Sequence, residues 1–435
     1  MTFLEELRWR GLLHQQTADE ALERHLAEPR VAYCGFDPTS DSLHVGNLIP
    51  ITLLMHWQRA GHTPIVVMGG GTGLIGDPSG RDAERQLLSR DQVEANVASQ
   101  RRIFERLLDF DDSRPNGAVI VNNLDWLERL GFIEVLRDVG KHFSVNMMIQ
   151  KDSVRERLHT REQGISFTEF SYMILQAYDF LHLRRTMQCT VQLAGSDQYG
   201  NIVAGIDLIR REGAGSGAHG ADAYGITAPL VERSDGRKMS KSSGQAVWLS
   251  SDTRDATGPY TFYQYWINLP DADVVQWLRW FTLMDREQID ALAGRHEAEP
   301  HRRLAQTELA RHMTKLVHGE DELKRVETAT AALFGLGDLR ELDEATLAEV
   351  FADVPHSMHD QAQLAGDGAS LVEVLAATTL AASRSTAREQ LGSGAISVNG
   401  AKCPPDRRLT TGDLLPGATI LLRRGKKHWH ATKWE

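Results

Sequence analysis

Two short stretches of this 435-residue chain carry side chains suited to binding phosphate groups. His44 and Asn47 stand three residues apart where an apolar run gives way to a helical pattern, so both can share one side of the helix start. A helix start offers free N–H groups and positive partial charge, which suit an anion. Further along, residues 238–242 read Lys-Met-Ser-Lys-Ser. Such a cluster is commonly a basic surface loop, but its two lysines could also close over a triphosphate as point charges.

A third candidate is a polar stripe on an otherwise apolar helix. Residues 166–169 read Ser-Phe-Thr-Glu, a capping box that predicts a helix start. Tyr172, Gln176 and Asp179 then follow at intervals of four and three residues, on one side of that helix. Such a stripe is either a solvated face or the wall of a polar pocket. The lack of Lys and Glu on it favours a pocket for a small polar ligand.

The glycine-rich residues 71–76 match the pattern GxGxxG directly after an apolar run, which is typical of a dinucleotide-binding turn. Pro78, however, falls where the phosphate-binding helix should continue, and a proline inside a helix costs about 3 kcal/mol. This argues against a nicotinamide oxidoreductase. We interpret the stretch as a loop that lets the backbone approach a ligand, with Asp77 directed at the same crevice.

The elements that must position these groups alternate along the first half of the chain. Strands are expected at residues 30–34, 63–68, 118–121 and 189–193, and helices at residues 46–61, 92–108 and 168–180. Strands alternating with helices predict a parallel sheet of the α/β class. In such sheets ligands sit beyond the carboxyl ends of the strands, where the polar groups named above fall.

The rest of the chain departs from this alternation. A Gly/Ala-rich segment at residues 213–218 is expected to be a surface loop. Residues 260–333 read as mostly helical, with Trp266, Trp277, Trp280 and Phe281 as core candidates. Asn399-Gly400 after an alternating run predicts a hairpin in a small C-terminal α+β unit. The resulting domains are 1–228 (the α/β domain), 229–345 (the lysine cluster and helices), 346–368 (linker) and 369–435 (α+β unit).

Composition limits the class of protein. With 41% hydrophobic and 25% charged residues, the chain is ordinary for a globular protein. Its three cysteines are widely spaced and form no CxxC, so neither a structural metal nor a disulfide framework is predicted. No apolar run suggests a signal peptide or a membrane span, so we expect a cytoplasmic protein. The net charge of −11 argues against nucleic-acid binding by the whole surface, but residues 423–427 form a local basic patch.

Taken together, these features resemble the class I aminoacyl-tRNA synthetases. Residues 44–47 (His-Val-Gly-Asn) resemble their HIGH signature, and residues 238–242 match their KMSKS signature in full. Four further stretches resemble the bacterial tyrosyl branch, at residues 33–39, 73–80, 166–179 and 195–198. Residues 385–388 and 395–400 resemble the S4 RNA-binding domain of that branch. The resemblance covers nearly the whole chain and implies an α/β, Rossmann-like parallel-sheet catalytic domain, then an α-helical domain and a small α+β S4-like domain.

This resemblance implies a two-step reaction. Tyrosine and ATP, the latter with Mg²⁺, form tyrosyl-adenylate and pyrophosphate, and the tyrosyl group then moves to the 3′ end of tRNA(Tyr). The attacking carboxylate is already a nucleophile, so catalysis consists mainly of positioning and charge stabilisation. Homodimerisation is also implied, with residues 143–151 in the region of the family's interface.

The resemblance also assigns roles to individual residues. The tyrosine contacts implied are Tyr33, Asp77, Tyr172, Gln176, Asp179 and Gln198. The ATP contacts implied are Cys34, Gly35, Asp37, Thr39, His44, Gly46, Asn47, Gly195, Asp197, Lys238 and Lys241. The groups expected to act on the phosphates during catalysis are Thr39, His44, Asn47, Arg81, Arg85, Lys238 and Lys241. The tRNA contacts implied are Arg384, Arg388, Arg423, Arg424, Lys426 and Lys427.

Two other readings share much of this pattern. A tryptophanyl synthetase has both signatures, but Tyr33 and Asp179 suit a phenol, whereas an indole offers a donor only. An RNA-binding factor descended from a synthetase would not need both lysines of the KMSKS signature, His44 and a complete amino-acid pocket. In an assay of tyrosine activation, each of these two readings predicts a result different from that of a tyrosyl synthetase.

Overall fold

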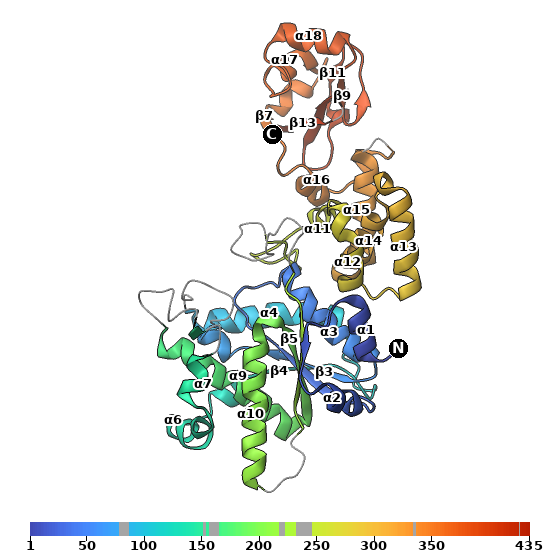
Figure 1. The fold of residues 1–435 in the computed structure, drawn as a ribbon. Helices are drawn as coiled ribbons and strands as arrows, with labels where there is room; N and C mark the ends of the chain where they lie inside the picture. Colours follow the sequence, from blue (N-terminus) through green and yellow to red (C-terminus); the bar gives the residue numbers. More distant parts are fainter. Residues whose placement is uncertain are drawn as a thin grey trace. The chain divides into compact units, whose positions relative to one another are not determined.

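The computed structural model describes residues 1–77, 87–150, 154–155, 165–216, 222–231, 246–333, 336–425 and 427–435. These residues fold into two compact units (Figure 1). The first contains Met1–Thr257 and Trp266–Val317, and the second contains Gly258–Tyr265 and His318–Glu435.

A six-stranded sheet forms the centre of the first unit, in the order β1-β6-β5-β2-β3-β4. Its strands are β1 (Gln15–Gln16), β2 (Val31–Phe36), β3 (Thr63–Met68), β4 (Val119–Asn122), β5 (Cys189–Gly195) and β6 (Tyr224–Ala228). Strands β2 to β6 are parallel, and the short β1 pairs antiparallel with β6 at the edge. Strand β3 is buried almost throughout and reads as an apolar run, and β5 is equally buried although it includes Thr190 and Gln192. The predicted α/β class is confirmed.

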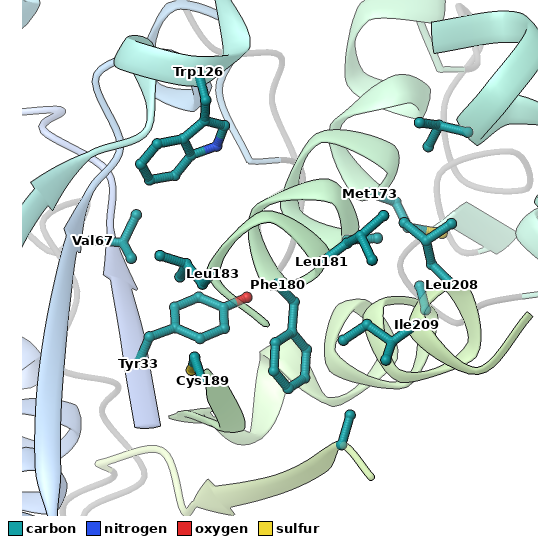
Figure 2. Packing of buried hydrophobic residues seen from close by; sticks show 14 of the residues in the cluster. Tyr33, Val67, Trp126, Met173, Phe180, Leu181, Leu183, Cys189, Leu208 and Ile209 are labelled. Carbon is teal, nitrogen blue, oxygen red and sulfur yellow. The ribbon is translucent and has the colours of Figure 1, made fainter. Parts of the chain in front are cut away.

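Helices cover this sheet. They are α1 (Phe3–Arg10), α2 (Asp19–His25), α3 (Leu48–Arg59), α4 (Arg90–Leu107), α5 (Leu124–Leu127), α6 (Phe132–Glu134), α7 (Val145–Ile149), α9 (Phe167–Met187) and α10 (Tyr199–Ser216). Helix α9 begins as predicted, with the Ser166 side chain accepting the N–H of Glu169. Side chains of β2, α9 and α10 share one buried cluster, in which the Tyr33 ring lies beside Phe180 (Figure 2).

The order of the strands creates a crevice. From β2 the chain passes to β3 and β4 on one side, and it then returns to β5 on the other side of β2. Loops that leave β2 and β5 therefore diverge, which opens a ligand site at the carboxyl ends of these two strands. Tyr33 and Gln192 are partners in the register of these strands, so they stand side by side below the crevice.

Two expected elements differ from the structure. The helix expected from residue 46 starts with a 3-10 turn, Val45–Asn47, before α3 begins at Leu48. The loop expected at residues 213–218 is wrong for 213–216, where α10 continues to Ser216, and the remainder lies outside the described residues. Helix α10 packs along α9 through Leu208 and Ile209, and this burial outweighs the weak helix propensity of the glycines at its end.

The first unit also holds helices α12 (Asp271–Phe281), α13 (Arg286–Ala298) and most of α14 (Leu304–His318). Trp266, Trp277 and Phe281 are buried and meet one another at ring distances of 5.2 to 5.8 Å. Trp280, a fourth expected core residue, is only partly buried, and its indole N–H donates to the carbonyl of Gly11 at 3.1 Å.

The second unit combines helices with a five-stranded sheet in the order β10-β9-β12-β13-β7. Its strands are β7 (His356–His359), β9 (Ile396–Val398), β10 (Ala401–Lys402), β12 (Thr419–Arg424) and β13 (His428–Trp434), and β8 (Ala369–Ser370) pairs separately with β11 (Arg408–Leu409). Its helices are α15 (Glu320–Leu333), α16 (Glu344–Val350), α17 (Leu371–Ala376), α18 (Arg384–Gly392) and the first part of α11 (Pro259–Ile267). Asn399 and Gly400 have φ values of 47° and 84° between β9 and β10, which forms the predicted hairpin.

The linker expected at residues 346–368 needs correction. These residues include the end of α16, strand β7, which pairs in parallel with β13, and Leu364, which is buried in the core of the C-terminal unit. The segment escaped detection because β7 is an edge strand of four residues, His-Ser-Met-His, that alternate between exposed and partly buried. Such a strand carries no continuous apolar signal.

Candidate active site

A cavity of about 390 Å³ opens at the crevice between β2 and β5. This volume is typical of sites for small molecules. Its walls come from β2, the loop from β2 to α3, the glycine-rich loop after β3, helix α9 and the turn after β5. Segments far apart in the sequence therefore meet in one site, as expected for a switch point of a parallel sheet.

One end of the cavity pairs a buried hydroxyl with a buried carboxylate. Tyr33 is 1% exposed, and its hydroxyl has no hydrogen-bond partner among the described residues. Asp179 is 4% exposed and accepts hydrogen bonds from Trp126 Nε1 at 2.7 Å and Asn123 Nδ2 at 2.9 Å. A buried hydroxyl without a partner costs about 1–3 kcal/mol, so this end of the cavity is suited to a ligand that carries its own hydroxyl.

Burial is the main cause of the shifted pKa values of Asp179 and Tyr33. Desolvation raises the pKa of Asp179 to about 7, although the hydrogen bonds from Asn123 and Trp126 act in the opposite direction. Desolvation also raises the pKa of Tyr33 well above its usual value, and the Asp179 charge adds to this effect. The Tyr33 hydroxyl therefore keeps its proton, whereas Asp179 titrates near neutral pH.

A chain of hydrogen bonds runs from Asp179 across the cavity floor. Asn123 Nδ2, already bonded to Asp179, lies 3.0 Å from Thr72 Oγ1. Thr72 Oγ1 donates to Asp37 Oδ1 at 2.8 Å, and the Tyr172 hydroxyl donates to Asp37 Oδ2 at 2.9 Å. These bonds fix the orientation of both carboxylates before any ligand enters.

Close packing requires glycine at two positions where the glycine-rich loop leaves β3. A Cβ atom at Gly69 would collide with Asp37 Oδ1, and one at Gly70 would collide with the side chain of Asn122. The Asn123 Oδ1 atom accepts the backbone N–H of Gly71 at 2.7 Å. The loop is thus packed against Asp37 and Asn123, which supports the interpretation of close backbone approach over that of a dinucleotide-binding turn.

The opposite wall carries a second polar network. Gln198 Nε2 donates to Asp77 Oδ2 at 2.7 Å and to Asp197 Oδ2 at 3.0 Å. Asn201 Nδ2 donates to Gln176 Oε1 and to Gln198 Oε1, both at 3.0 Å. Burial raises the pKa of Asp197, and the charge of Asp77 adds to it.

The charge of the cavity is negative. Its described lining contains four aspartates, one histidine and neither lysine nor arginine: Asp37, Asp77, Asp179, Asp197 and His44. Such a field attracts an ammonium group and repels phosphates. A bound triphosphate would thus need positive charge from elsewhere, beyond the helix start at Val45.

That helix start is closed by a reciprocal cap. His44 Nδ1 accepts the backbone N–H of Gly46 at 3.0 Å, and Asn47 Oδ1 accepts the backbone N–H of His44 at 3.0 Å. Because Nδ1 is an acceptor, the neutral imidazole carries its proton on Nε2. The Nε2 atom takes no part in the cap, and His44 helps to line the cavity.

The described residues that were predicted to bind tyrosine or ATP meet around this one cavity. Those that line it are Tyr33, Cys34, Gly35, Asp37, Thr39, His44, Gly46, Asn47, Asp77, Tyr172, Gln176, Asp179, Gly195, Asp197 and Gln198. Burial raises the pKa of the Cys34 thiol, so it stays protonated and acts as a neutral wall. Arg81, Arg85, Lys238 and Lys241 lie outside the described residues, so their predicted roles are untested.

Sequence reasoning missed several residues of the site. They are Thr72, Asn123, Trp126, Gln192, Asn201 and Trp248. Asn123 directly follows the end of β4, so the rule that ligands bind beyond the strand ends could have indicated it. Trp126, Asn201 and Trp248 belong to no pattern, and only the folded chain brings them to the site.

The basic residues predicted to bind tRNA lie in the second unit. Arg388 on α18 and Lys427 are exposed, whereas Arg384 pairs with Glu373 at 2.6 Å. Arg424 donates to the carbonyl of Leu380 at 2.6 Å, and the Arg423 guanidinium lies 4.8 Å from the centre of the Trp429 ring. Arg423 thus packs across β12 and β13, and Arg424 ties β12 to the segment between α17 and α18. Lys426 is outside the described residues.

In the part of the chain that the structure describes, no group of three or more His, Cys, Asp or Glu side chains is arranged to hold a metal ion. Within the same ranges, no helix has the length and apolar character needed to cross a membrane.

Comparison with known proteins gives consistent matches. A sequence model described as "tRNA synthetases class I (W and Y)" matches residues 26–335, and one described as "Tyrosine--tRNA ligase SYY-like C-terminal domain" matches residues 346–432. The tyrosine–tRNA ligase of Roseiflexus castenholzii is 48% identical, over 99% of this chain and 98% of that protein. The tyrosine–tRNA ligase of Opitutus terrae is 47% identical over 100% of both. A C-terminally truncated mitochondrial tyrosyl-tRNA synthetase of Coccidioides posadasii, solved by crystallography, matches with a TM-score of 0.65 and 30% identity, over 75% of this chain and 91% of that chain.

Proposed function

We propose that this chain, which belongs to the tyrosine–tRNA ligase family of class I aminoacyl-tRNA synthetases, joins L-tyrosine to ATP and then transfers the tyrosyl group to tRNA(Tyr). The observation that carries the proposal is the cavity itself. It places a buried hydroxyl and carboxylate at one end and a capped helix start at the other. The hydroxyl and the carboxylate suit a phenol, and the helix start suits a chain of phosphates.

Selection of tyrosine rests on Tyr33 and Asp179. The substrate's phenol would donate to the Asp179 carboxylate and accept from the Tyr33 hydroxyl, which has no partner among the described residues. Phenylalanine would leave the Tyr33 hydroxyl unpaired, at a cost of about 1–3 kcal/mol, and would give Asp179 no donor beyond Trp126 and Asn123. Tryptophan offers a ring N–H but no acceptor for Tyr33, so the tryptophanyl alternative is disfavoured.

The ammonium group of the substrate suits the acidic middle of the cavity. The side chains that we assign to it are Asp77, Tyr172 and Gln176, with Gln198 near the carboxylate. The Tyr172 hydroxyl donates to Asp37, and because a hydroxyl oxygen is also an acceptor, we assign it the role of accepting a hydrogen bond from the ammonium. This arrangement holds the substrate carboxylate at a fixed position for the first reaction step.

In that step a carboxylate oxygen of tyrosine attacks the α-phosphorus of ATP, and the bond to the β,γ-pyrophosphate breaks. No proton needs to be removed from the nucleophile, so the protein positions the groups and stabilises charge. We assign phosphate contacts to Thr39, the His44 Nε2–H and the N–H groups at the start of the helix. Lys238 and Lys241, with Arg81 and Arg85, would add the positive charge that the described lining lacks.

ATP is a substrate here, and Mg²⁺ would enter with its phosphates as a counter-charge. The ATP contacts that we propose on this side of the cavity are Cys34, Gly35, Asp37, Gly46, Asn47, Gly195 and Asp197. In the second step a ribose hydroxyl of the terminal tRNA nucleotide attacks the tyrosyl carbonyl carbon, and AMP leaves.

Contacts with tRNA(Tyr) are assigned to the second unit, through Arg384, Arg388, Arg423, Arg424, Lys426 and Lys427. Arg384, Arg388 and Lys427 are its exposed members among the described residues, and Arg388 and Lys427 are not engaged in the ion pair that Arg384 makes with Glu373. Exposed cations of this kind are the best placed to reach phosphates. The proposal includes a cytoplasmic location, where tRNA and ATP occur together and where free cysteines such as Cys34 and Cys189 stay reduced.

We further assign a homodimer to the face formed by α6 and α7. Large apolar side chains are exposed there, with Phe132 at 66%, Ile133 at 71% and Val145 and Met147 at 56%. A group of exposed apolar side chains on two short helices is typical of a protein interface. The exposed residues of α7 lie inside the stretch at residues 143–151 that the sequence analysis expected at the interface.

The test is pyrophosphate exchange into ATP, followed by charging of tRNA. We expect exchange with tyrosine and none above background with tryptophan or phenylalanine. Exchange with tryptophan alone would support the tryptophanyl alternative. Binding of RNA without any exchange would support an RNA-binding factor, and either result would refute the proposal.

A further inference from the structure

Two amide side chains of helix α4 hold the loop that follows β2. Asn96 Nδ2 donates to the Pro38 carbonyl at 2.9 Å, and Gln100 Nε2 donates to the Ser40 carbonyl at 2.8 Å. The two amides are four residues apart on α4, so they lie on one face of the helix. Thr39 is the residue between the two bonded carbonyls. This face of α4 therefore fixes the backbone on both sides of Thr39.

Other contacts fix the same loop. Thr72 Oγ1 donates to Asp37 Oδ1 at 2.8 Å, and the Ser40 hydroxyl donates to the Asp255 carboxylate. The Thr39 N–H donates to the Asp37 carbonyl at 2.8 Å, which closes a tight turn. The loop is thus held from three directions, by α4, by the glycine-rich loop and by Asp255, and it is rigid enough to place a functional group.

Gln100 makes its hydrogen bond although its own oxygen stays unpaired. The residue is 1% exposed, and its Oε1 atom has no hydrogen-bond partner among the described residues. The amide cannot turn over, because Oε1 would then face the carbonyl oxygen of Ser40. An unpaired buried acceptor is unfavourable and uncommon, so a glutamine at this place needs a reason other than packing. An apolar side chain would fill the space without this cost, but it would not donate to Ser40.

The place of the loop supplies that reason. Thr39, Ser40 and Gln100 all line the cavity. We propose that Asn96 and Gln100 are positioning residues for the activation of tyrosine, which act by fixing the backbone at Thr39 so that this residue meets the phosphates of ATP. The inference rests on the proposed function, because that function assigns Thr39 to the phosphates.

Under this proposal the two amides act through Thr39 and not by contact with a substrate. Their loss should slow the chemical step, because the transition state depends on the position of the groups around the phosphates. Tyrosine should still bind as before, because the phenol end of the cavity, at Tyr33 and Asp179, belongs to β2 and α9.

The experiment is a double-mutant cycle on the full chain, read as the single-turnover rate of tyrosyl-adenylate formation at saturating ATP and tyrosine. Gln100→Met keeps the length of the side chain but cannot donate, and we expect it to lower the rate about tenfold while half-saturating tyrosine changes by less than about twofold. In a Thr39→Val background, Gln100→Met should cost less than about twofold, since the hydroxyl that it places is gone. Asn96→Ala removes the other donor and should show the same pattern, which keeps the inference testable if Gln100→Met folds poorly.

The matched control is Gln58→Met. Gln58 Nε2 also donates to two backbone carbonyls, those of Asp109 and Asn116 at 2.7 and 3.1 Å, but none of these three residues lines the cavity. This variant should unfold at a lower temperature than wild type and keep the wild-type rate. An equal loss of rate in Gln58→Met would overturn the inference, as would equal losses for Gln100→Met with and without the Thr39 hydroxyl. Wild-type exchange with tyrosine decides the proposed function separately, so the inference can fail while the function stands.

Discussion

At the scale of single residues, Asp179 is the group on which the selection of tyrosine proposed above depends most. It is buried, and both of its oxygens accept hydrogen bonds, one from Trp126 and one from Asn123. Its carboxylate is therefore oriented before the ligand arrives, and the protein does not need to reorganise to bind a phenol.

Replacement of Asp179 by alanine should reduce discrimination between tyrosine and phenylalanine. The phenol would lose a charged acceptor, and hydrogen bonds to charged groups contribute about 1.5–3 kcal/mol, so activation of tyrosine should fall by at least tenfold. Phenylalanine makes no such bond and should lose far less. Exchange rates measured for both amino acids check this, with Asp138→Ala, an exposed aspartate outside the cavity, as control. An unchanged ratio of the two rates would contradict the assignment.

The titration of Asp179 predicts how tyrosine affinity depends on pH. Its pKa is raised to about 7, so the ionised form that accepts the phenol is present above neutral pH and is lost as pH falls through 7. Tyrosine should therefore bind about tenfold more weakly at pH 6 than at pH 8. Calorimetric titration of the free enzyme at the two pH values measures this. The Asp179→Asn variant, which cannot ionise, should show weaker binding with no such dependence, and a wild-type affinity that is flat over this range would refute the argument.

At the scale of elements, the contact between α1 and α12 depends on one buried cation. Arg10 is 1% exposed and donates to three carbonyl groups at the end of α12, those of Arg279, Thr282 and Met284, at 2.5 to 2.9 Å. It also pairs with Glu6 at 2.6 Å. A guanidinium suits this place because its fork of donors can satisfy several carbonyls that the helix end leaves unpaired.

Substitution of Arg10 by methionine should therefore destabilise the first unit. The change leaves buried carbonyls without donors, and loss of one partner of a buried network costs about 3–5 kcal/mol. Thermal unfolding of the variant should occur several degrees below that of wild type. Arg8→Met is the matched control, because Arg8 is exposed and pairs with an exposed Glu23, a contact of about 0–1 kcal/mol. If both variants unfolded at the same temperature, Arg10 would not be the support described here.

Elements differ in how well the sequence predicts them, and the reason is physical. Strand β3 was predicted at its observed bounds because its apolar run is buried and ends at glycines. His44 and Asn47 were predicted to share a side, and they do, because a cap is a local structure. Trp248 was not predicted, since its place beside His44 depends on pairing between segments about 200 residues apart. Strand β7 was missed because its stability comes from β13, and its own sequence is polar.

At the scale of the whole molecule, the position of the domain boundary decides which parts can be separated. The sequence analysis placed the last boundary at residue 369, after a linker. In the structure, Leu342, Leu347 and Phe351 of the α16 region share a buried cluster with Leu421 and Ala431 of the C-terminal sheet. A chain cut at residue 369 would expose this cluster and would leave β7 without its partner β13.

The division into units indicates a better cut. A chain that ends at Val317 keeps the sheet, the cavity, α12, α13 and most of α14, and it loses every basic residue assigned to tRNA. It also keeps Gly258–Tyr265, a short segment of the second unit. We expect it to exchange pyrophosphate at a rate within about threefold of wild type and to charge tRNA at least a hundredfold more slowly, since the phosphate contacts supply most of the RNA affinity. The comparison is a chain that ends at residue 369, which should be less soluble than both wild type and the Val317 chain. It would expose the apolar α16 cluster, whose burial is worth about 25 cal/mol per Å² of apolar surface. Equal loss of exchange and charging in the Val317 chain would show that activation depends on the second unit, and the modular organisation proposed here would then be wrong.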